Sequence, residues 1–218
     1  TRQHWKNLPA DERAAFRFLH VSTDEVYGDL GFDGPTPLYG SLAPDAPIIS
    51  YSSLSKAYLA PGWRGGWMAV GRTPRLDEVL AAIKKLADGR LCSPGPMQFA
   101  VEAALTGDRS HQQSFARELR VRADLTMARL GASPHLRCVA PQAAFYVMPQ
   151  VRLPQGTTDE DFVLGLLRDA GILCVYGSGF GMPADQGFFR IVYLASPDEL
   201  SAIYDDLVAY AARFVRNA

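Results

Sequence analysis

The chain has 218 residues, of which 48% are hydrophobic and 21% are charged, so its composition is that of an ordinary globular protein with one large domain or two small ones. Its 22 basic and 23 acidic residues leave a formal net charge of -1. This balance, without a basic face, argues against nucleic acid and anionic membranes as partners.

Three cysteines and four histidines are scattered along the chain. The cysteines form no CxxC pair, which is typical of buried thiols in a reducing compartment. The histidines show no metal-binding spacing, no apolar run approaches the length that spans a membrane, and the first residues do not resemble a signal peptide. We therefore predict a cytoplasmic protein without a metal site.

The first half of the chain alternates strands with polar loops, as α/β proteins do. A predicted strand at 16–22 runs into Asp24, and a carboxylate at the C-terminal end of a strand lies where open α/β sheets contact ligands. A connection rich in Gly and Pro over 31–47 leads to a short apolar strand at 47–51. A further strand is predicted at 67–70.

Three helices are predicted next. The first begins with Thr73 as N-cap and Pro74 at the first helical position and ends at Gly89, and a second covers 96–105. The third, 109–130, is long and charged with only a loose apolar stripe, which is typical of a helix that bridges two domains. We therefore predict a cofactor-binding domain over 1–120 and a small domain over 121–218.

The second domain reads as a small α+β unit. Thr157 and Glu160 form a predicted capping box for a helix ending at 170, and Ser196 and Glu199 form another for the terminal helix. The predicted strands of this domain are 136–139, 144–148, 172–176 and 188–194.

The most informative stretch is 52–68, where Lys56 lies between small hydroxyl residues and a segment rich in Gly and aromatic residues. An unprotonated lysine amine attacks an aldehyde and forms a Schiff base when its neighbours hold its pKa down. Arg64 is a permanent planar cation suited to phosphate, and the hydroxyls of Ser53 and Ser55 bond phosphate oxygens. An exposed lysine and arginine in an idle loop is the alternative, but two tryptophans with Gly and Pro make an unusual idle loop.

These groups and two others fit one cofactor, pyridoxal 5'-phosphate (PLP). Lys56 would bond its aldehyde, and Ser53, Ser55 and Arg64 would hold its phosphate. Asp24 can bond the protonated ring nitrogen, which keeps the ring an electron sink, and Tyr27 can bond the ring oxygen.

Arg190 lies inside the apolar predicted strand 188–194, where an unpaired charge is unfavourable. One interpretation is an edge-strand residue that faces solvent or is paired internally. The other is a bidentate clamp for the α-carboxylate of an amino acid, which the lysine stretch favours.

Five stretches together resemble the C-terminal half of the fold-type I, class I/II aminotransferases, most closely the alanine and aromatic branch. The resemblance covers about residues 24–218 and is carried by 24–30, 53–67, 143–146, 177–181 and 189–191. It implies an α/β fold, with part of a large domain on a mainly parallel sheet and a small α+β domain. It also implies PLP-dependent transfer of an α-amino group from an amino acid to a 2-oxo acid, and a homodimer.

The resemblance assigns roles to the same residues. Lys56 would be the Schiff-base and proton-transfer lysine, Asp24 the partner of the ring nitrogen and Tyr27 the partner of the ring oxygen. Ser53 and Arg64 would be phosphate ligands, and Arg190 would bind the substrate carboxylate.

The chain departs from the family pattern because the family's N-terminal half is not found in it. A catalytically inactive fragment, or a domain that senses an amino acid or binds a partner, is therefore the alternative function. Residues 1–31 instead resemble nucleotide-sugar 4,6-dehydratases, with Thr23, Asp24 and Glu25 as the matching set, and a junction between two parent sequences near 24–30 is our hypothesis.

An NAD-dependent dehydratase is the least favoured function. That chemistry needs a glycine-rich dinucleotide turn, which the sequence lacks. It also needs a Tyr-x-x-x-Lys pair, but Ser52 occupies the tyrosine position before Lys56, and Tyr51 is one residue too early. On a helix a one-residue slip rotates a side chain by roughly 100°.

Overall fold

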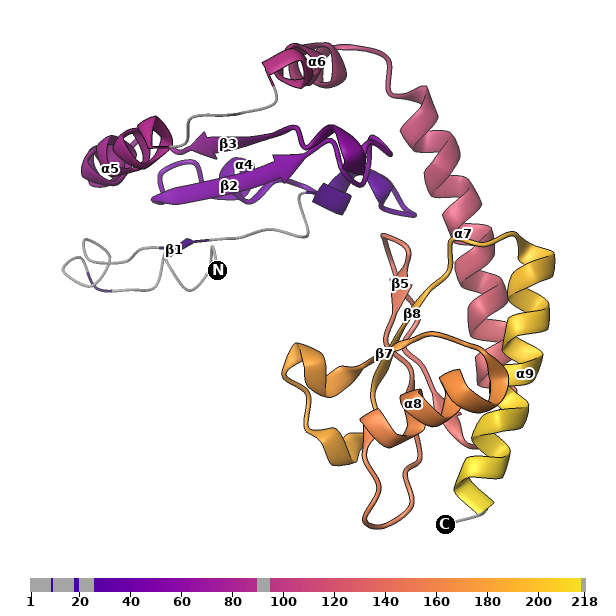
Figure 1. Ribbon diagram of the computed structural model, residues 1–218. Coiled ribbons are helices and arrows are strands. Elements are labelled where there is room, and N and C mark those ends of the chain that lie inside the picture. Colours follow the sequence, from indigo (N-terminus) through magenta and orange to yellow (C-terminus); the bar gives the residue numbers. More distant parts are fainter. Residues whose placement is uncertain (1–8, 10–17, 20–25, 90–94, 217–218) are drawn as a thin grey trace. The chain divides into compact units, whose positions relative to one another are not determined.

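The computed structural model describes residues 9, 18–19, 26–89 and 95–216 (Figure 1). The chain divides into two compact units, residues 1–114 and 115–218, and each is described by itself. The division falls inside the long helix α7 (Ser110–Gly131), as does the boundary predicted at 120/121.

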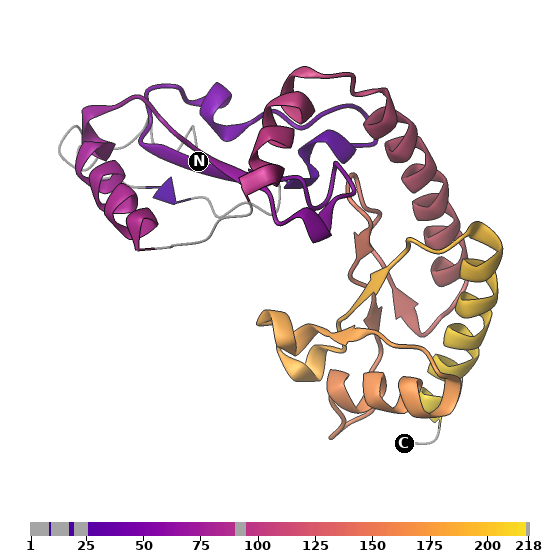
Figure 2. The same cartoon turned by 45° about the horizontal axis from the view of Figure 1, so that its top comes forward.

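The first unit is built on a three-stranded sheet in the order β1-β2-β3, in which β2 and β3 run side by side (Figure 2). β1 pairs with β2 in parallel over two residues, whereas β2 pairs with β3 antiparallel from Ile49↔Val70 to Ser53↔Gly66. The parallel pair agrees with the predicted α/β class, while the antiparallel return of β3 was not foreseen. The elements of this unit are β1 (Phe18–Leu19), η1 (Gly28–Leu30), α4 (Tyr39–Leu42), β2 (Ile48–Ser53), η2 (Pro61–Trp63), β3 (Gly66–Val70), η3 (Pro74–Leu76), α5 (Asp77–Asp88) and α6 (Gly95–Thr106).

The core of the first unit gathers around the two ends of β2. At its start Ile48 packs with Tyr39 of α4 and with Ala43 and Ala46, which follow that helix. Beyond its end Leu54 is only 1% exposed. The helices α5 and α6 bury no residue completely, and Phe99 of α6 is 84% exposed. Along α5, Val79 and Leu86 are 37% and 77% exposed, so its apolar residues are only partly covered.

The second unit packs helices against two small antiparallel ladders. β8 is the central strand of the order β5-β8-β7, and β4 pairs with β6. The elements are α7, β4 (Leu136–Arg137), β5 (Tyr146–Val147), β6 (Gln150–Val151), α8 (Asp159–Ala170), β7 (Val175–Tyr176), η4 (Gly177–Phe180), η5 (Ala184–Gln186), β8 (Phe189–Val192) and α9 (Pro197–Arg216).

An aromatic cluster forms the core of this unit. The ring of Phe162 on α8 lies 5.1 Å from that of Phe189, 5.4 Å from that of Tyr210 and 5.3 Å from that of Phe214. Such ring pairs stabilise a core beyond the area they bury. Because these rings come from α8, β8 and α9, the cluster fixes β8, which carries Arg190, against two helices.

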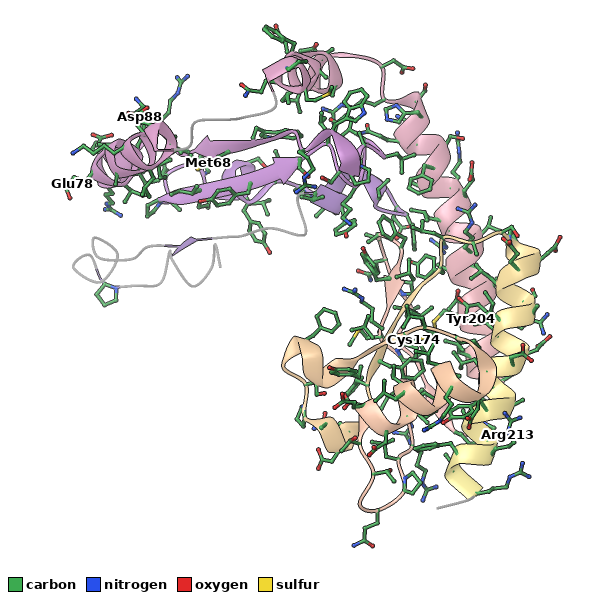
Figure 3. The ribbon with its side chains drawn as sticks, in the orientation of Figure 1. Met68, Glu78, Asp88, Cys174, Tyr204 and Arg213 are labelled. Atoms are coloured by element: carbon green, nitrogen blue, oxygen red, sulfur yellow. The ribbon has the colours of Figure 1, made fainter. Side chains whose placement is uncertain are left out.

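The helices α7 and α9 are joined by one buried polar contact. Tyr204 lies on α9 where it runs alongside α7 (Figure 3), and its hydroxyl is 2.8 Å from that of Thr126. Thr126 also donates to the Arg122 carbonyl at 2.7 Å. Tyr204 therefore donates to Thr126, and both buried hydroxyls are satisfied, as buried polar groups require.

Helix α8 begins one residue later than predicted. Its N-cap is Thr158, whose hydroxyl accepts from the Asp161 N–H at 3.1 Å while the Asp161 carboxylate accepts from the Thr158 N–H at 2.9 Å. The prediction of Thr157 and Glu160 was thus wrong by one position. Thr157 instead donates its hydroxyl proton to the Pro154 carbonyl at 2.8 Å. The box of Ser196 and Glu199 at the start of α9 is confirmed.

Candidate functional site

Lys56 follows β2 in the connection that leads to β3. Leu54 and Ala57, on either side of Ser55 and Lys56, are 1% and 2% exposed, whereas Lys56 itself is half-buried. The two apolar side chains act as anchors because their burial stabilises only one placement of the backbone between them. The sequence therefore holds Lys56 on a fixed turn with its side chain still within reach of solvent.

Backbone hydrogen bonds close this connection on itself. The Leu54 N–H donates to the Gly65 carbonyl, and the Ala60 N–H donates to the Leu54 carbonyl, both at 3.0 Å. The Ala57 N–H donates to the Val26 carbonyl at 3.3 Å. The last bond brings the segment that carries Tyr27 directly beside the lysine turn, although the two are far apart in the sequence.

Two residues of the connection have a backbone conformation that side chains disfavour. Leu59 has φ 54° and Arg64 has φ 53°. Left-handed conformations of such residues persist only where surrounding contacts enforce them, and they gather at functional sites. The hydrogen bonds of Leu54 with Gly65 and Ala60 are the contacts that enforce them here.

The predicted phosphate ligands lie at the end of β2 and on the connection that follows it. The Ser53 hydroxyl accepts from the Ser55 N–H at 3.2 Å. Arg64 is exposed, and its guanidinium donates to the Pro61 carbonyl at 3.0 Å. Opposite Ser53 lies Gly66, where an added Cβ would come within 2.8 Å of the Ser52 carbonyl. The close pairing of the two strands at the base of the connection thus requires glycine.

The two predicted ring ligands differ in what can be said of them. Tyr27 is half-buried and is the N-cap of η1, next to the Val26 carbonyl that Ala57 contacts. Asp24, like Thr23 and Glu25, lies outside the described residues.

A cavity of about 510 Å³ lies in the first unit, and the sequence did not predict it. Its walls include Ala57 and Tyr58, which directly follow Lys56, and the ion pair in which Arg109 donates to both carboxylate oxygens of Asp29 at 3.1 Å. Within the described part of the chain, the buried Tyr58 hydroxyl has no hydrogen-bond partner. Lys56 and Arg64 are not among the lining residues, so the cavity is beside the lysine turn rather than at it.

In the second unit, Arg190 lies on the central strand β8. Its guanidinium carbon is 4.4 Å from the centre of the Phe180 ring and 4.9 Å from that of the Tyr146 ring. Its Nε is buried and has no hydrogen-bond partner among the described residues. The guanidinium is therefore neither on an edge strand nor ion-paired with another described residue, which weighs against the alternative drawn from the sequence. An unsatisfied buried donor is unfavourable by about 1–3 kcal/mol, so it needs an explanation.

The ring of Phe180 is held by a short turn that a buried carboxylate fixes. Asp159 is fully buried and accepts from the Ser178 N–H at 2.6 Å and from the Ser178 hydroxyl at 3.0 Å. Ser178 and Phe180 belong to the same turn, η4. Asp159 was missed in the sequence because it sits inside a run of three acidic residues at a helix start, which normally indicates a solvated N-terminus.

Comparison with known proteins decides the family. The family model described as aminotransferase class I and II matches residues 1–205. The chain belongs to this aminotransferase family. The match begins at residue 1, so it includes the segment 1–31 for which the sequence also suggested a dehydratase.

Curated aminotransferases match the chain at moderate identity. It is 32% identical over 195 residues to the alanine aminotransferase of Mycobacterium tuberculosis, covering 87% of this chain and 45% of the relative. It is 39% identical over 171 residues to the LL-diaminopimelate aminotransferase of Nitratidesulfovibrio vulgaris, covering 77% of this chain and 41% of the relative. The chain spans about half the length of the curated relatives it matches.

Solved aminotransferase structures share the fold. An alanine aminotransferase from Pyrococcus furiosus superposes with a TM-score of 0.81 at 36% identity, covering 87% of this chain and 48% of the other. The aspartate aminotransferase of Thermotoga maritima superposes with a TM-score of 0.75 at 25% identity, covering 93% and 49%. The predicted class, a partial aminotransferase fold with a small α+β domain, is confirmed.

Members of this aminotransferase family depend on PLP, and the lysine connection fits that cofactor. It offers an amine for the aldehyde, and two hydroxyls and a guanidinium for the phosphate, on a backbone closed by its own hydrogen bonds. The described part of the chain holds no group of three or more His, Cys, Asp or Glu side chains that could bind a metal ion. None of its helices combines the length and apolar composition that crossing a bilayer requires.

Proposed function

We propose that this chain belongs to a PLP-dependent aminotransferase that transfers an α-amino group from an amino acid to a 2-oxo acid. One observation carries the proposal: Ser53 at the end of β2, and Ser55, Lys56 and Arg64 in the connection to β3, lie on one stretch of backbone that is closed by its own hydrogen bonds. Family membership supports the reaction class.

The residues of the first unit bind the cofactor. Lys56 bonds the PLP aldehyde, and Ser53, Ser55 and Arg64 hold the phosphate by charge-assisted hydrogen bonds. Asp24 bonds the ring nitrogen and Tyr27 the ring oxygen. The bound cofactor supplies an electron sink that acidifies the Cα–H bond of the amino acid. When its amine is free, Lys56 takes that Cα proton through Nζ.

Arg190 recognises the substrate in the second unit. Its contacts with the Tyr146 and Phe180 rings restrict where the planar guanidinium can lie, and its buried Nε, which has no partner among the described residues, supports a ligand rather than a structural role. The relatives named for alanine, tyrosine and LL-diaminopimelate act on compounds that share only an α-amino and an α-carboxylate group. We therefore assign Arg190 to the α-carboxylate and leave the rest of the amino acid open.

The oligomer and the compartment are also part of this proposal. A homodimer follows from the resemblance to the family, and sedimentation velocity on the purified chain tests it. A cytoplasmic location is supported by Cys138 and Cys174, which are free thiols, as proteins of reducing compartments have.

The experiment is a PLP titration followed by visible absorption, because PLP joined to a lysine amine absorbs at longer wavelength than its hydrated aldehyde. We expect the long-wavelength band in the unmodified chain and its loss in Lys56→Ala. Lys84→Ala is the matched control, since Lys84 is an exposed lysine on α5, and it keeps the band. Absence of the band from the unmodified chain would contradict the proposal and favour an inactive fragment or an interaction domain.

A further inference from the structure

A second cluster of cationic side chains lies on the two-stranded ladder of β4 and β6, which the lysine turn and Arg190 do not involve. Leu136 pairs with Val151 and Arg137 pairs with Gln150. The Arg152 N–H extends the ladder by donating to the His135 carbonyl at 3.0 Å.

The alternation of side chains along these strands sorts them onto two faces. Leu136 and Val151 are 5% and 1% exposed and therefore face the core. Successive residues of a strand point to opposite faces, and paired residues share one. His135, Arg137, Gln150 and Arg152 consequently share the outer face, a grouping that their positions in the sequence do not reveal.

This outer face is the wall of a hollow of about 460 Å³, which Asp185 and Gln186 also line. The opposite wall is held in place by hydrogen bonds. The Gln150 side-chain amide donates to the Gln186 carbonyl, and the Val151 N–H donates to the Gly187 carbonyl, both at 2.8 Å. Gly187 has φ 72°, and an added Cβ there would collide with the Val151 carbonyl oxygen. The hollow is thus a built feature rather than a gap between loose loops.

The charges in the hollow are unbalanced. The guanidinium groups of Arg137 and Arg152 have no ion-pair or hydrogen-bond partner among the described residues, whereas Arg120, Arg122 and Arg129 of α7 each contact an acidic side chain. Asp185 is the one acidic residue of the lining, so two guanidinium charges face one carboxylate. Guanidinium groups bind phosphate and carboxylate through paired N–H donors.

We propose that this hollow binds a small oxyanion, the phosphate or carboxylate group of a metabolite, between Arg137 and Arg152, with the imidazole of His135 beside it. The site belongs to the second unit and is independent of the lysine turn, so it does not rest on the aminotransferase reaction.

Calorimetric titration of the chain with pyrophosphate, and separately with succinate, tests the proposal. We expect one of the two probes to bind and its Kd to rise about tenfold or more in Arg137→Gln/Arg152→Gln, because the paired N–H donors of both guanidinium groups are lost. Arg168→Gln/Arg216→Gln, which removes two exposed charges from α8 and α9, is the matched control and changes the Kd less than about twofold. Which probe binds identifies the phosphate or the carboxylate as the source.

Asp185→Asn gives an effect of opposite sign. Removing the carboxylate from the hollow tightens oxyanion binding by about threefold, since it removes a repulsion that solvent screens only in part.

Two further variants separate this hollow from the proposed cofactor and substrate positions. Binding of either probe that persists in Arg64→Gln and in Arg190→Gln does not occur at those positions. The proposal fails if neither probe binds, or if Arg137→Gln/Arg152→Gln binds both as tightly as the unmodified chain. Arg64, Arg137, Arg152, Arg168, Asp185 and Arg216 are exposed, whereas Arg190 is half-buried. Circular dichroism checks that every variant, Arg190→Gln above all, is folded.

Discussion

At the scale of single residues, the Arg190 guanidinium is the most unusual group of the second unit. A buried, unsatisfied Nε beside two ring faces is unfavourable unless a ligand completes it. The strand position was evident from the sequence because an arginine interrupts an apolar run. The two rings beside it could not be predicted, because Tyr146 and Phe180 are distant from Arg190 or from each other in sequence and aromatic residues usually fill cores.

Arg190→Lys tests whether substrate binding needs the planar guanidinium with its paired N–H donors. Lysine keeps the charge but has no paired N–H donors, so we expect Kd or KM for the amino acid to rise by about tenfold or more, which corresponds to the loss of about 1.5–3 kcal/mol. Arg213→Lys is the control, because that guanidinium also lies over a ring, 5.8 Å from the centre of Tyr210. Equal effects of the two substitutions on substrate binding would contradict the role given to Arg190.

Asp159→Ala tests the carboxylate that fixes the η4 turn. It leaves the half-buried Ser178 N–H without its partner, so we expect the free energy of unfolding to fall by about 1–3 kcal/mol. The substitution also loosens Phe180, so substrate binding weakens. Urea unfolding measures the first effect, with the exposed Glu160→Ala as the neighbouring control. A change of less than about 0.5 kcal/mol would show that Ser178 does not depend on Asp159.

At the scale of elements, the sequence was informative where periodicity and caps agree. The strands β2 and β3 and the helices α5, α6, α7 and α9 lie within a few residues of their predicted positions. The start of α8 was misplaced because two adjacent threonines each have an acid three residues on. Burial of Asp159 against Ser178 selects Thr158 as N-cap, and this tertiary contact leaves no local signal.

The direction of β3 shows the same limit. The succession of a strand, a loop and a second strand predicts an α/β pattern but not the direction of the second strand. The hydrogen bonds of Leu54 with Gly65 and Ala60 show that the connection folds back, so that β3 runs antiparallel to β2. The lysine, the serines and Arg64 were recognised from spacing, whereas the left-handed backbone at Leu59 and Arg64 was not.

Gly66→Ala tests that return. The added methyl group meets the Ser52 carbonyl at 2.8 Å and the Ser53 Cβ at 3.1 Å, so β2 and β3 must separate at the base of the lysine connection. We expect a loss of about 1–3 kcal/mol in the free energy of unfolding and weaker PLP binding. Gly62→Ala, where an added Cβ meets nothing within 4 Å, is the control. Unchanged PLP affinity in Gly66→Ala would mean that this strand spacing does not position Ser53.

At the scale of the whole molecule, the chain combines a second unit with a complete aromatic core and a first unit whose helices α5 and α6 bury no residue completely. Because titratable groups are buried in the second unit, its free energy of unfolding changes with pH in the alkaline range. Burial raises the pKa of Cys174 from its usual 9.0 to about 11 and that of Tyr204 from 10.0 to about 12.

Both groups keep their protons longer in the folded chain than in the unfolded chain. Their contribution to stability is therefore complete below about pH 9 and is lost as the pH rises toward about 11–12. We expect the free energy of unfolding, from urea titrations, to fall between about pH 8.5 and about pH 10.5, and to fall less steeply in Cys174→Ala. A free energy that stays level or rises over this range would be inconsistent with the burial of these groups.

We propose that Lys56 is the lysine that bonds the PLP cofactor. The most direct measurement is to load the chain with PLP, reduce it with borohydride to fix any lysine-bound cofactor, and locate the added mass by peptide mass spectrometry. We expect one modified lysine, Lys56, with Lys84 and Lys85 unmodified. Cofactor mass spread over several lysines, or absent from Lys56, would contradict it.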